Sequence, residues 1–444
     1  MFDVCILGGG PSGLAMALRL AQLGRSTVVV EKAASPTRRL GESLTNGVLP
    51  LLGALQVPIE PSVFFHAPPS RVWWTGELNV QSTRAGLTVD RGVFDTILWE
   101  AAATAGVTVR RPARALKFEK REHWSIALDN GQELKARFLA DASGRARILG
   151  GRKRALGRQT LAMYAYWSNP DSGNRETVVE AGGSEWYWAA SLPDGSVNAI
   201  VFVDREDARR ERYPELIRKS KLLSPWLEKG RCGEIHLCDA TPFLDETPAT
   251  AGSIKVGDAA LSVDPLSSQG VQIAMGTALH AAVVINTILD RPWDRGLASE
   301  FYRRRIQASA QFHARAAAQL YSIQAQHTPT RFWQVRATAG PVERPAKGVQ
   351  LPSLDCLVQT SPRARFRTIA TVDEAYVVES SGVELGDEIF ARLGDLSIAA
   401  LLEEARRPIV ARDLVKQWTV QFSISFASRV FEWAWDRSLL EAVP

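Results

Sequence analysis

Three glycines near the N-terminus have the spacing of a turn that binds the pyrophosphate of a dinucleotide. Gly8, Gly10 and Gly13 form a G-x-G-x-x-G pattern directly after an apolar stretch, with Pro11 and Ser12 between the last two glycines. In this pattern the first glycine permits the tight turn, the second lets phosphate approach the backbone, and the third lets the next helix pack closely. The N–H groups at the start of that helix point at the bound phosphate. All five residues are therefore predicted to bind a cofactor.

The elements that must position this turn form a βαβ unit. Residues 2–7 and 27–30 are apolar runs typical of buried strands, and residues 14–23 have the pattern of a helix. Glu31 ends the second strand eighteen residues past the last glycine, where a carboxylate can bond the ribose hydroxyls of the cofactor. The glycine pattern alone is a weak signal, but its register with two strands, a helix and an acid predicts a Rossmann-like dinucleotide-binding domain.

Segments far along the chain carry groups that suit a flavin. Arg91 lies in an Asp-Arg-x-x-Phe-Asp motif, from which an arginine can reach phosphates or the flavin edge, and Asp258 follows a glycine at the end of an apolar run. Residues 264–270 lead into a helix whose N-terminal dipole can stabilise negative charge on the pyrimidine edge of a reduced flavin. The predicted cofactor-binding residues outside the glycine turn are Glu31, Lys32, Arg39, Ser43, Arg91, Asp258, Pro265, Gly270 and Val271.

Composition indicates a globular protein. The 444 residues are 45% hydrophobic and 23% charged, and no apolar run reaches the roughly 18 residues of a transmembrane helix. The net charge of +5 is mild and its basic residues are dispersed, so neither nucleic acid nor a membrane is an expected partner. Four cysteines and the absence of a signal-peptide pattern favour the cytoplasm, and no metal site is predicted because Cys232, His236 and Cys238 match no zinc spacing.

The expected fold class is α/β, with a Rossmann-like domain, an antiparallel-sheet domain and a small C-terminal α+β module. Residues 1–156 and 230–328 are assigned to a discontinuous FAD-binding domain. Residues 157–229, rich in aromatics and short strands, are assigned to a sheet on the substrate side. Residues 329–371 are expected to be a linker or lid, and residues 372–444 the C-terminal module.

Four helices outside the βαβ unit have clear signals. Residues 41–55 form an apolar stretch expected to be helical, and Asp90 is a natural cap for a helix that ends before Gly106. Residues 270–289 and 296–327 predict two long helices.

The chain resembles the FAD-dependent monooxygenases built on the p-hydroxybenzoate hydroxylase fold, and within them the tryptophan halogenase branch. The resemblance covers roughly residues 1–328, and it implies bound FAD, with Glu31 on the adenosine ribose, Arg91 and Asp258 near the pyrophosphate and ribityl chain, and Gly270 near the isoalloxazine. The motifs that carry it are the glycine turn, Gly41-Glu42-Ser43, Asp141-Ala142-Ser143-Gly144, Gly257-Asp258 and Asp264-Pro265.

The chain differs from the halogenases at the residues that, by this resemblance, should carry out the halide chemistry. Those enzymes carry a lysine where residues 63–68 of this chain have none, and a glutamate where this chain has Ser267. Their Trp-x-Trp-x-Ile-Pro signature appears only loosely, as Trp186-Tyr187-Trp188 with Pro193 further on. These differences from the halogenases therefore favour hydroxylation over halogenation.

The predicted reaction is hydroxylation of an aromatic ring through a C4a-hydroperoxyflavin, which forms from reduced FAD and O2. The cofactor itself performs the difficult step, so the protein needs no further oxidising group. His66 is the candidate catalytic base, since it lies close to the missing lysine and histidine exchanges protons near neutral pH. A packed or surface histidine is the structural alternative. Trp73, Tyr164, Trp186 and Trp188 are the candidate substrate-binding residues, with sheet packing as their alternative role.

The C-terminal module resembles a winged helix of the kind that holds a peptide partner in peptide-modifying systems, and a simple extension packed on the flavin domain is the alternative. Together these features resemble the flavoproteins that mature tryptophylquinone enzymes, including the monooxygenase of quinohemoprotein amine dehydrogenase biogenesis. The implied substrate is a tryptophan side chain of a peptide or protein.

Three other functions remain open from the sequence. They are hydroxylation of a free small aromatic metabolite, halogenation, and an isoprenoid-reductase-like role. No second glycine-rich fingerprint marks a nicotinamide site, so the electrons are expected from transiently bound NAD(P)H or from a partner flavin reductase.

Overall fold

The computed structural model describes residues 1–66, 70–81, 86–168, 177–337, 351–386, 388–393, 396–420 and 423–443. It divides into two compact units, one of Met1–Arg295 with Tyr302–Pro341 and the other of Gly296–Phe301 with Val342–Pro444. The four-part division of the sequence analysis is finer than this one and stays a prediction.

The first unit is built on a Rossmann-like sheet of seven strands in the order β8-β2-β1-β11-β10-β9, with β20 beside β11. Strands β1, β2, β8, β11 and β20 run parallel, and β9 and β10 form an antiparallel extension. The central strands are apolar along their whole length because both faces of a parallel sheet are covered. The strands are β1 (Phe2–Leu7), β2 (Thr27–Val30), β8 (Thr108–Arg110), β9 (Ala115–Lys120), β10 (Trp124–Leu128), β11 (Glu133–Asp141) and β20 (Ser253–Lys255).

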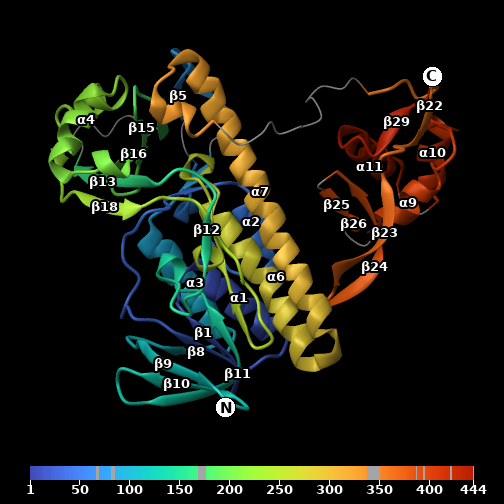
Figure 1. Cartoon of the computed structure of the whole chain (residues 1–444), viewed down its shortest axis with the longest axis horizontal. Helices are drawn as coiled ribbons and strands as arrows, with labels where there is room; N and C mark the ends of the chain where they lie inside the picture. The colour runs from blue at the N-terminus through green and yellow to red at the C-terminus, as the bar shows by residue number, and fades with distance from the viewer. Residues whose placement is uncertain are drawn as a thin grey trace. The chain divides into compact units, whose positions relative to one another are not determined.

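Helix α1 (Pro11–Gln22) follows β1 and packs against α3 (Arg91–Thr104) and the long helix α6 (Gly270–Asp290) (Figure 1). The cap predicted for α3 is confirmed, since the Asp90 side chain accepts hydrogen bonds from Gly92 N and Val93 N. Helix α6 begins at the predicted residue. The first βαβ unit and both of these helices therefore form as the sequence predicts.

The helix expected over residues 41–55 is wrong in its first half. Ser43–Leu44 form a short strand, β3, paired with β7 (Leu87–Thr88), and helix α2 begins only at Val48. Gly41 has φ = +101°, a left-handed conformation that a helix cannot include. The chain therefore turns at Gly41 and becomes helical after it has paired with β7.

A second sheet of the first unit has eight strands in the order β17-β13-β16-β15-β14-β5-β6, with β18 beside β13. It is mostly antiparallel, as expected, but it recruits strands from outside residues 157–229: β5 (Ser70–Trp74), β6 (Glu77–Gln81), β17 (Arg231–Cys232) and β18 (His236–Asp239). The strands within that range are β13 (Thr160–Ser168), β14 (Thr177–Ala181), β15 (Trp186–Ser191) and β16 (Ser196–Asp204).

Short elements complete the first unit. Two small sheets have the orders β12-β19-β21 and β3-β7-β4. Helix α7 (Arg295–His327) confirms the second long helix, although its residues Gly296–Phe301 group with the other unit. The remaining elements are β4 (Phe65–His66), β12 (Lys153–Ala155), β19 (Phe243–Asp245), β21 (Leu261–Ser262), α4 (Tyr213–Lys219), α5 (Leu223–Leu227) and α8 (Arg331–Gln334).

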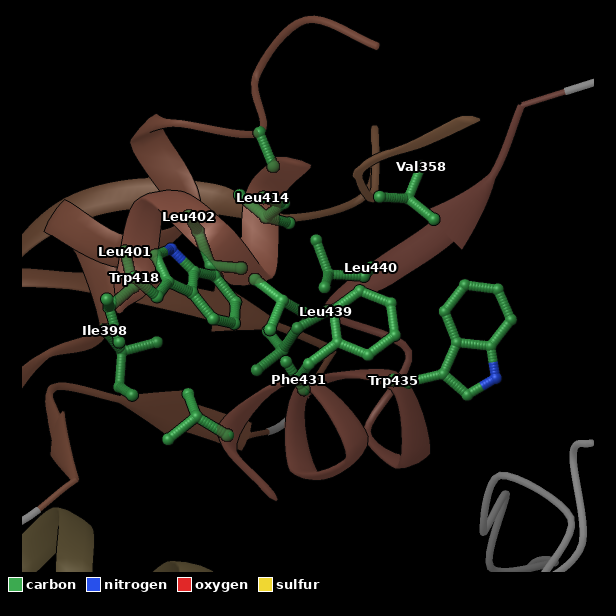
Figure 2. Close-up of a cluster of buried hydrophobic side chains, with 14 of the residues drawn as sticks. Val358, Ile398, Leu401, Leu402, Leu414, Trp418, Phe431, Trp435, Leu439 and Leu440 are labelled. Atoms are coloured by element: carbon green, nitrogen blue, oxygen red, sulfur yellow. The ribbon is translucent and has the colours of Figure 1, made fainter. Parts of the chain in front are cut away.

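The second unit is a small α+β module with its own core. Helix α11 (Ile424–Asp436) buries a stripe at helical spacing, Ala427, Val430, Phe431, Ala434 and Trp435, as an amphipathic helix does. Figure 2 shows Phe431 lying among Trp418, Leu439 and Leu440, all of them buried. Strands β22 (Leu357–Thr360) and β23 (Arg365–Asp373) belong to this unit, although β22 and most of β23 fall in residues 329–371, which were expected to be a linker or lid.

The order of elements in this module is compatible with the winged-helix resemblance. Helix α9 (Ile398–Glu403), strand β28 (Ile409–Val410), helix α10 (Ala411–Trp418), α11 and strand β29 (Leu440–Ala442) follow one another, and β22 lies between β28 and β29. An antiparallel hairpin of β23 and β24 (Tyr376–Leu385), extended by β25 (Glu388–Phe390), and the pair β26 (Arg392–Leu393) and β27 (Leu396–Ser397) precede them.

Among the described helices, α6 alone is long and apolar enough to cross a membrane. Of its most apolar window, 61% is buried inside the protein. That burial is what a core helix of the Rossmann-like domain requires.

Candidate active site

The first and last glycines of the turn between β1 and α1 leave no room for a side chain. Gly8 has φ = +115°, and a Cβ there would lie 2.4 Å from the carbonyl oxygen of Ala142. A Cβ on Gly13 would lie 2.0 Å from the carbonyl oxygen of Gly8. The turn is thus held against β11 on one side and against α1 on the other, as a backbone cradle for phosphate must be.

The start of α1 is free to bind an anion. Gly10 is its N-cap without a side-chain hydrogen bond, Pro11 is its first residue, and its first turn contains no acidic residue. The start of α6 is equally uncapped, with Gln269 at the N-cap and Gly270 as the first helical residue. Two long helices that present uncapped N–H groups fit a cofactor with a pyrophosphate and an anionic ring.

Glu31 lies at the edge of the cradle. Its Oε2 accepts a hydrogen bond from Gly9 N at 2.7 Å and its Oε1 accepts one from Ala33 N at 2.9 Å. The indole nitrogen of Trp99 donates to Gly9 O at 2.7 Å, so both polar groups of Gly9 are held. The contact of Glu31 with a ribose stays a prediction, as does that of the exposed Lys32 beside it.

Asp95 joins the two predicted cofactor arginines. It is completely buried, and its carboxylate accepts hydrogen bonds from Arg91 at 3.2 Å and from Arg39. Arg91 also donates to Leu40 O at 2.8 Å, so the donors of this buried guanidinium are bonded to protein groups. Arg39 is exposed, and its guanidinium lies 3.7 Å from the position of a Cβ on Gly10. Arg39 is therefore the better placed of the two to meet phosphate.

Other predicted residues converge on the same region. A Cβ on Gly257 would lie 2.7 Å from Ser12 Oγ, which brings the Gly257-Asp258 turn beside the start of α1. A Cβ on Gly41 would lie 2.5 Å from Arg91 Nη1 and 3.5 Å from Val271 Cγ2. Burial raises the pKa of Asp258, and the positive charges of Arg145 and Arg91 partly oppose this.

The segment before α6 is also well ordered by hydrogen bonds. Asp264 caps the turn Pro265–Ser267 through Leu266 N at 3.0 Å, and its carboxylate accepts the hydroxyl of Tyr321 at 3.0 Å. Burial raises the pKa of Asp264. Ser267 Oγ donates to Asp264 O at 3.1 Å.

Glu42 is a site residue that was not predicted from the sequence. Its side chain is 1% exposed, and Oε1 accepts hydrogen bonds from Tyr166 OH at 2.8 Å and from Asn198 Nδ2 at 3.0 Å. It thus links the Gly41-Glu42-Ser43 segment to strands β13 and β16. Only its place in the Gly-Glu-Ser motif signalled it. Asp95 closes the Asp-Arg-x-x-Phe-Asp motif, whereas Trp99 gave no signal beyond its helix.

Two of the predicted substrate residues are buried in a hydrophobic core, and a contact of either with a substrate stays a prediction. Trp186 and Trp188 are 1% and 7% exposed and lie in a core cluster with Tyr321, Phe332 and Trp333. Trp186 stacks on Phe202 with ring centroids 3.8 Å apart. They share one face of β15, as expected from strand alternation, and that face packs against residues of α7 and α8.

Trp73, Tyr164 and His66 keep their candidacy. Trp73 lies on the opposite face to Trp74 and borders a cavity of about 610 Å³ with Lys221, Glu185 and His327. Tyr164 is half-buried, with its ring centroid 5.2 Å from that of His236. The backbone of His66 pairs with Leu87, across β7 from Leu44, while its side chain lies outside the part of the chain that the structure describes.

A smaller cavity lies next to the start of the Asp264 turn. Its volume is about 270 Å³, and its wall includes Val263, Asp264, His313, Tyr321 and Arg336. Alanines of α7 form much of the remaining wall, which makes the cavity mixed in polarity.

Known proteins resemble this chain along most of its length. A sequence model described as FAD dependent oxidoreductase matches residues 3–165. A tryptophan 2-halogenase from Chondromyces crocatus is 30% identical over 370 residues, which are 76% of this chain and 70% of the halogenase.

Two solved structures match the fold from end to end. The peptidyl tryptophan dihydroxylase QhpG, essential for tryptophylquinone cofactor biogenesis, has a TM-score of 0.76 and 25% identity, with 98% of this chain and 99% of QhpG covered. CmlS, a flavin-dependent halogenase, has a TM-score of 0.82 with 99% and 96% covered, and at 18% identity it shows the fold alone. The chain therefore belongs to the FAD-dependent oxidoreductases of the tryptophan halogenase family, and it is a flavin-dependent monooxygenase.

Proposed function

We propose that the protein hydroxylates the indole ring of a tryptophan side chain carried by a peptide or protein, during the biogenesis of a quinone cofactor. Two relatives support a tryptophan substrate, because the 30% identical halogenase and the structural neighbour QhpG are both named for action on tryptophan. The QhpG match also covers 98% of the chain and so includes the C-terminal module.

The observation that carries oxygenation rather than halogenation is the side chain at position 267. By the halogenase resemblance a glutamate should stand there. This chain has Ser267, whose hydroxyl donates a hydrogen bond to the backbone oxygen of Asp264 at 3.1 Å. Residues 63–68 also lack the lysine of the halogenases. Without these groups the oxygen atom is transferred to the ring itself.

In this proposal FAD, reduced by NAD(P)H or by a partner reductase, supplies the oxidising chemistry with O2. The chain binds the pyrophosphate with the glycine turn and the start of α1, and Arg39 adds a positive charge above Gly10. Asp258 and Val271 are assigned to the ribityl side of the cofactor, together with Ser43 of strand β3. Pro265 and Gly270 direct the start of α6 to the ring.

Substrate positioning is assigned to Tyr164 and the cavity beside Asp264. His66 is proposed as the base that accepts a proton from the substrate, and the enzyme is placed in the cytoplasm. His66→Ala should slow substrate hydroxylation without changing FAD content, and an unchanged rate would remove His66 from the mechanism.

Halogenation of tryptophan is the second candidate, favoured by the 30% identity to a tryptophan 2-halogenase. One experiment separates the two. The holoenzyme is reduced and exposed to O2 with a tryptophan-containing protein partner, a Trp→Phe version of that partner, or free tryptophan, each with and without chloride and bromide. Mass spectrometry should find one or two added oxygen atoms on the tryptophan-containing partner alone.

Incorporation of chlorine or bromine would replace the proposal by the second candidate. Oxygen on free tryptophan, with none on the partner, would assign a small aromatic substrate instead.

A further inference from the structure

Glu42 and Asn198 form a buried pair in which two atoms lack a partner. Asn198 is fully buried and donates from Nδ2 to Glu42 Oε1 at 3.0 Å. Among the described residues, Glu42 Oε2 and Asn198 Oδ1 are buried and accept no hydrogen bond. Each unsatisfied buried acceptor carries a desolvation cost, so a pair of them in two bonded side chains requires an explanation.

We propose that Glu42 is held as a neutral carboxylic acid whose proton on Oε2 is donated to Asn198 Oδ1. A carboxylic acid and an amide are complementary, since each then donates once and accepts once. A single proton therefore satisfies both unpartnered atoms. The existing bond from Asn198 Nδ2 to Glu42 Oε1 is the other half of this two-bond pair.

The surroundings of Glu42 favour the neutral form. The titratable groups that face it are Arg91 from α3, and Tyr164 and Tyr166 from β13. Arg91 is the only cation among them, and its guanidinium is already bonded to Asp95 at 3.2 Å. Burial raises the pKa of Glu42 despite that charge and its two hydrogen bonds.

A neutral Glu42 has two consequences at the cofactor site. First, Glu42 then adds no negative charge beside Arg39 and Arg91, which share the carboxylate of Asp95, so more of their positive charge is available to an anionic cofactor. Second, the acid acts as a positioning residue, because it accepts the Tyr166 hydroxyl at 2.8 Å and so ties β13 to the loop that carries Ser43. The second consequence rests on the proposed function; the protonation of Glu42 does not.

The chain provides a matched control in Glu180. This carboxylate is also buried, at 2% exposure, but both of its oxygens are satisfied by donors: Lys221 N at 2.7 Å on Oε1, and Leu222 N at 2.9 Å and Ser220 Oγ on Oε2. It has no atom that requires a proton. A glutamine is isosteric with both residues, but it mimics only a protonated glutamate.

The test compares Glu42→Gln with Glu180→Gln in the full-length protein. Glu42→Gln should leave the Tm at neutral pH at or above that of wild type, because the new amide donates to Asn198 Oδ1 as the acid proton does. Glu180→Gln should lower the Tm by several degrees, because the new NH2 group would face a backbone N–H, and two donors cannot bond to each other. Glu42→Ala should also lower the Tm.

Infrared difference spectroscopy provides a readout that packing does not move. The wild-type protein at neutral pH should show the carbonyl band of a buried carboxylic acid, shifted in D2O and absent from Glu42→Gln, while Glu180→Gln keeps it. A loss of Tm in Glu42→Gln as large as in Glu180→Gln, or the absence of that band from wild type, would show that Glu42 is ionised. Neither measurement involves turnover, so each stands apart from the hydroxylation test.

Discussion

The indole nitrogen of Trp99 donates a hydrogen bond to the carbonyl oxygen of Gly9 at 2.7 Å, across 90 positions of sequence. This bond holds the phosphate-binding turn from the side of α3, opposite the bond that Glu31 accepts from Gly9 N. Since Gly9 lies between Gly8 and Gly10 of the motif, these two contacts fix the backbone in the middle of the turn.

Trp99→Phe should weaken FAD binding. It removes one buried hydrogen bond and leaves Gly9 O unsatisfied, at a cost of about 1 kcal/mol, or roughly fivefold in the Kd for FAD. Titration of the apoprotein with FAD measures this change. Trp124→Phe is the control, because Trp124 makes an equivalent bond to Gly252 O at 2.8 Å outside the cradle and should leave the Kd unchanged. Equal effects of the two variants would refute a specific role for Trp99.

Gly13→Ala should abolish stable FAD binding and destabilise the fold. The added Cβ would lie 2.0 Å from Gly8 O, so backbone must move, at a cost of about 1–3 kcal/mol. Gly53→Ala is the matched helical control: no atom lies within 4 Å of its Cβ position, and alanine should stabilise α2 by up to about 1 kcal/mol. FAD content after purification and chemical denaturation check both. A Gly13→Ala protein that retains FAD would contradict the close packing of α1 on the turn.

Asp95→Asn should be strongly destabilising. The carboxylate is completely buried and Arg91 is 5% exposed at the side chain, so the substitution leaves a buried guanidinium without its counter-charge, at a cost of about 3–5 kcal/mol. FAD affinity should fall as well, because Arg39 loses its anchor above Gly10. The exposed i,i+4 pair of Lys219 and Glu215 is the comparison, and Glu215→Gln should hardly change urea unfolding. Similar midpoints for the two variants would exclude a central role for Asp95.

Glu42 should make stability depend on pH in a specific direction. Its pKa is raised in the folded state by burial, whereas an unfolded glutamate has a pKa of about 4.3. Between those two pKa values the folded state binds one more proton than the unfolded state. The contribution of Glu42 to the free energy of unfolding is therefore fully present below about pH 4.3. It falls by about 1.4 kcal/mol per pH unit as pH rises, until the folded pKa is passed.

Urea unfolding of wild type and Glu42→Gln, from about pH 4.3 to neutral pH, measures this difference directly. The free energy of unfolding of wild type relative to Glu42→Gln should decrease with rising pH, because the variant cannot titrate at this position. A flat or rising difference would show that the folded protein does not hold the proton.

Local patterns were sufficient for the parts of the site that depend on a few neighbouring residues. The glycine spacing, the apolar strands on each side and the cap at Asp90 act through backbone geometry within one or two turns, and the structure confirms the elements that they predict. The same holds for α6 and α7, whose length makes the helical pattern unambiguous. The family also follows from these motifs, since their joint occurrence is specific.

Tertiary structure alone decided which side chains meet. The alternation along β15 shows that Trp186 and Trp188 share a face, but only the packing of α7 and α8 on that face shows that it is core. Likewise, no local pattern joins Glu42 to Asn198, or β5 to β14. Such pairings depend on how the sheets are assembled and covered. The cofactor cradle and the family therefore follow from local sequence patterns, whereas the buried acid, the pairing of both arginines with Asp95 and the surfaces left for a substrate follow from how the sheets and helices pack.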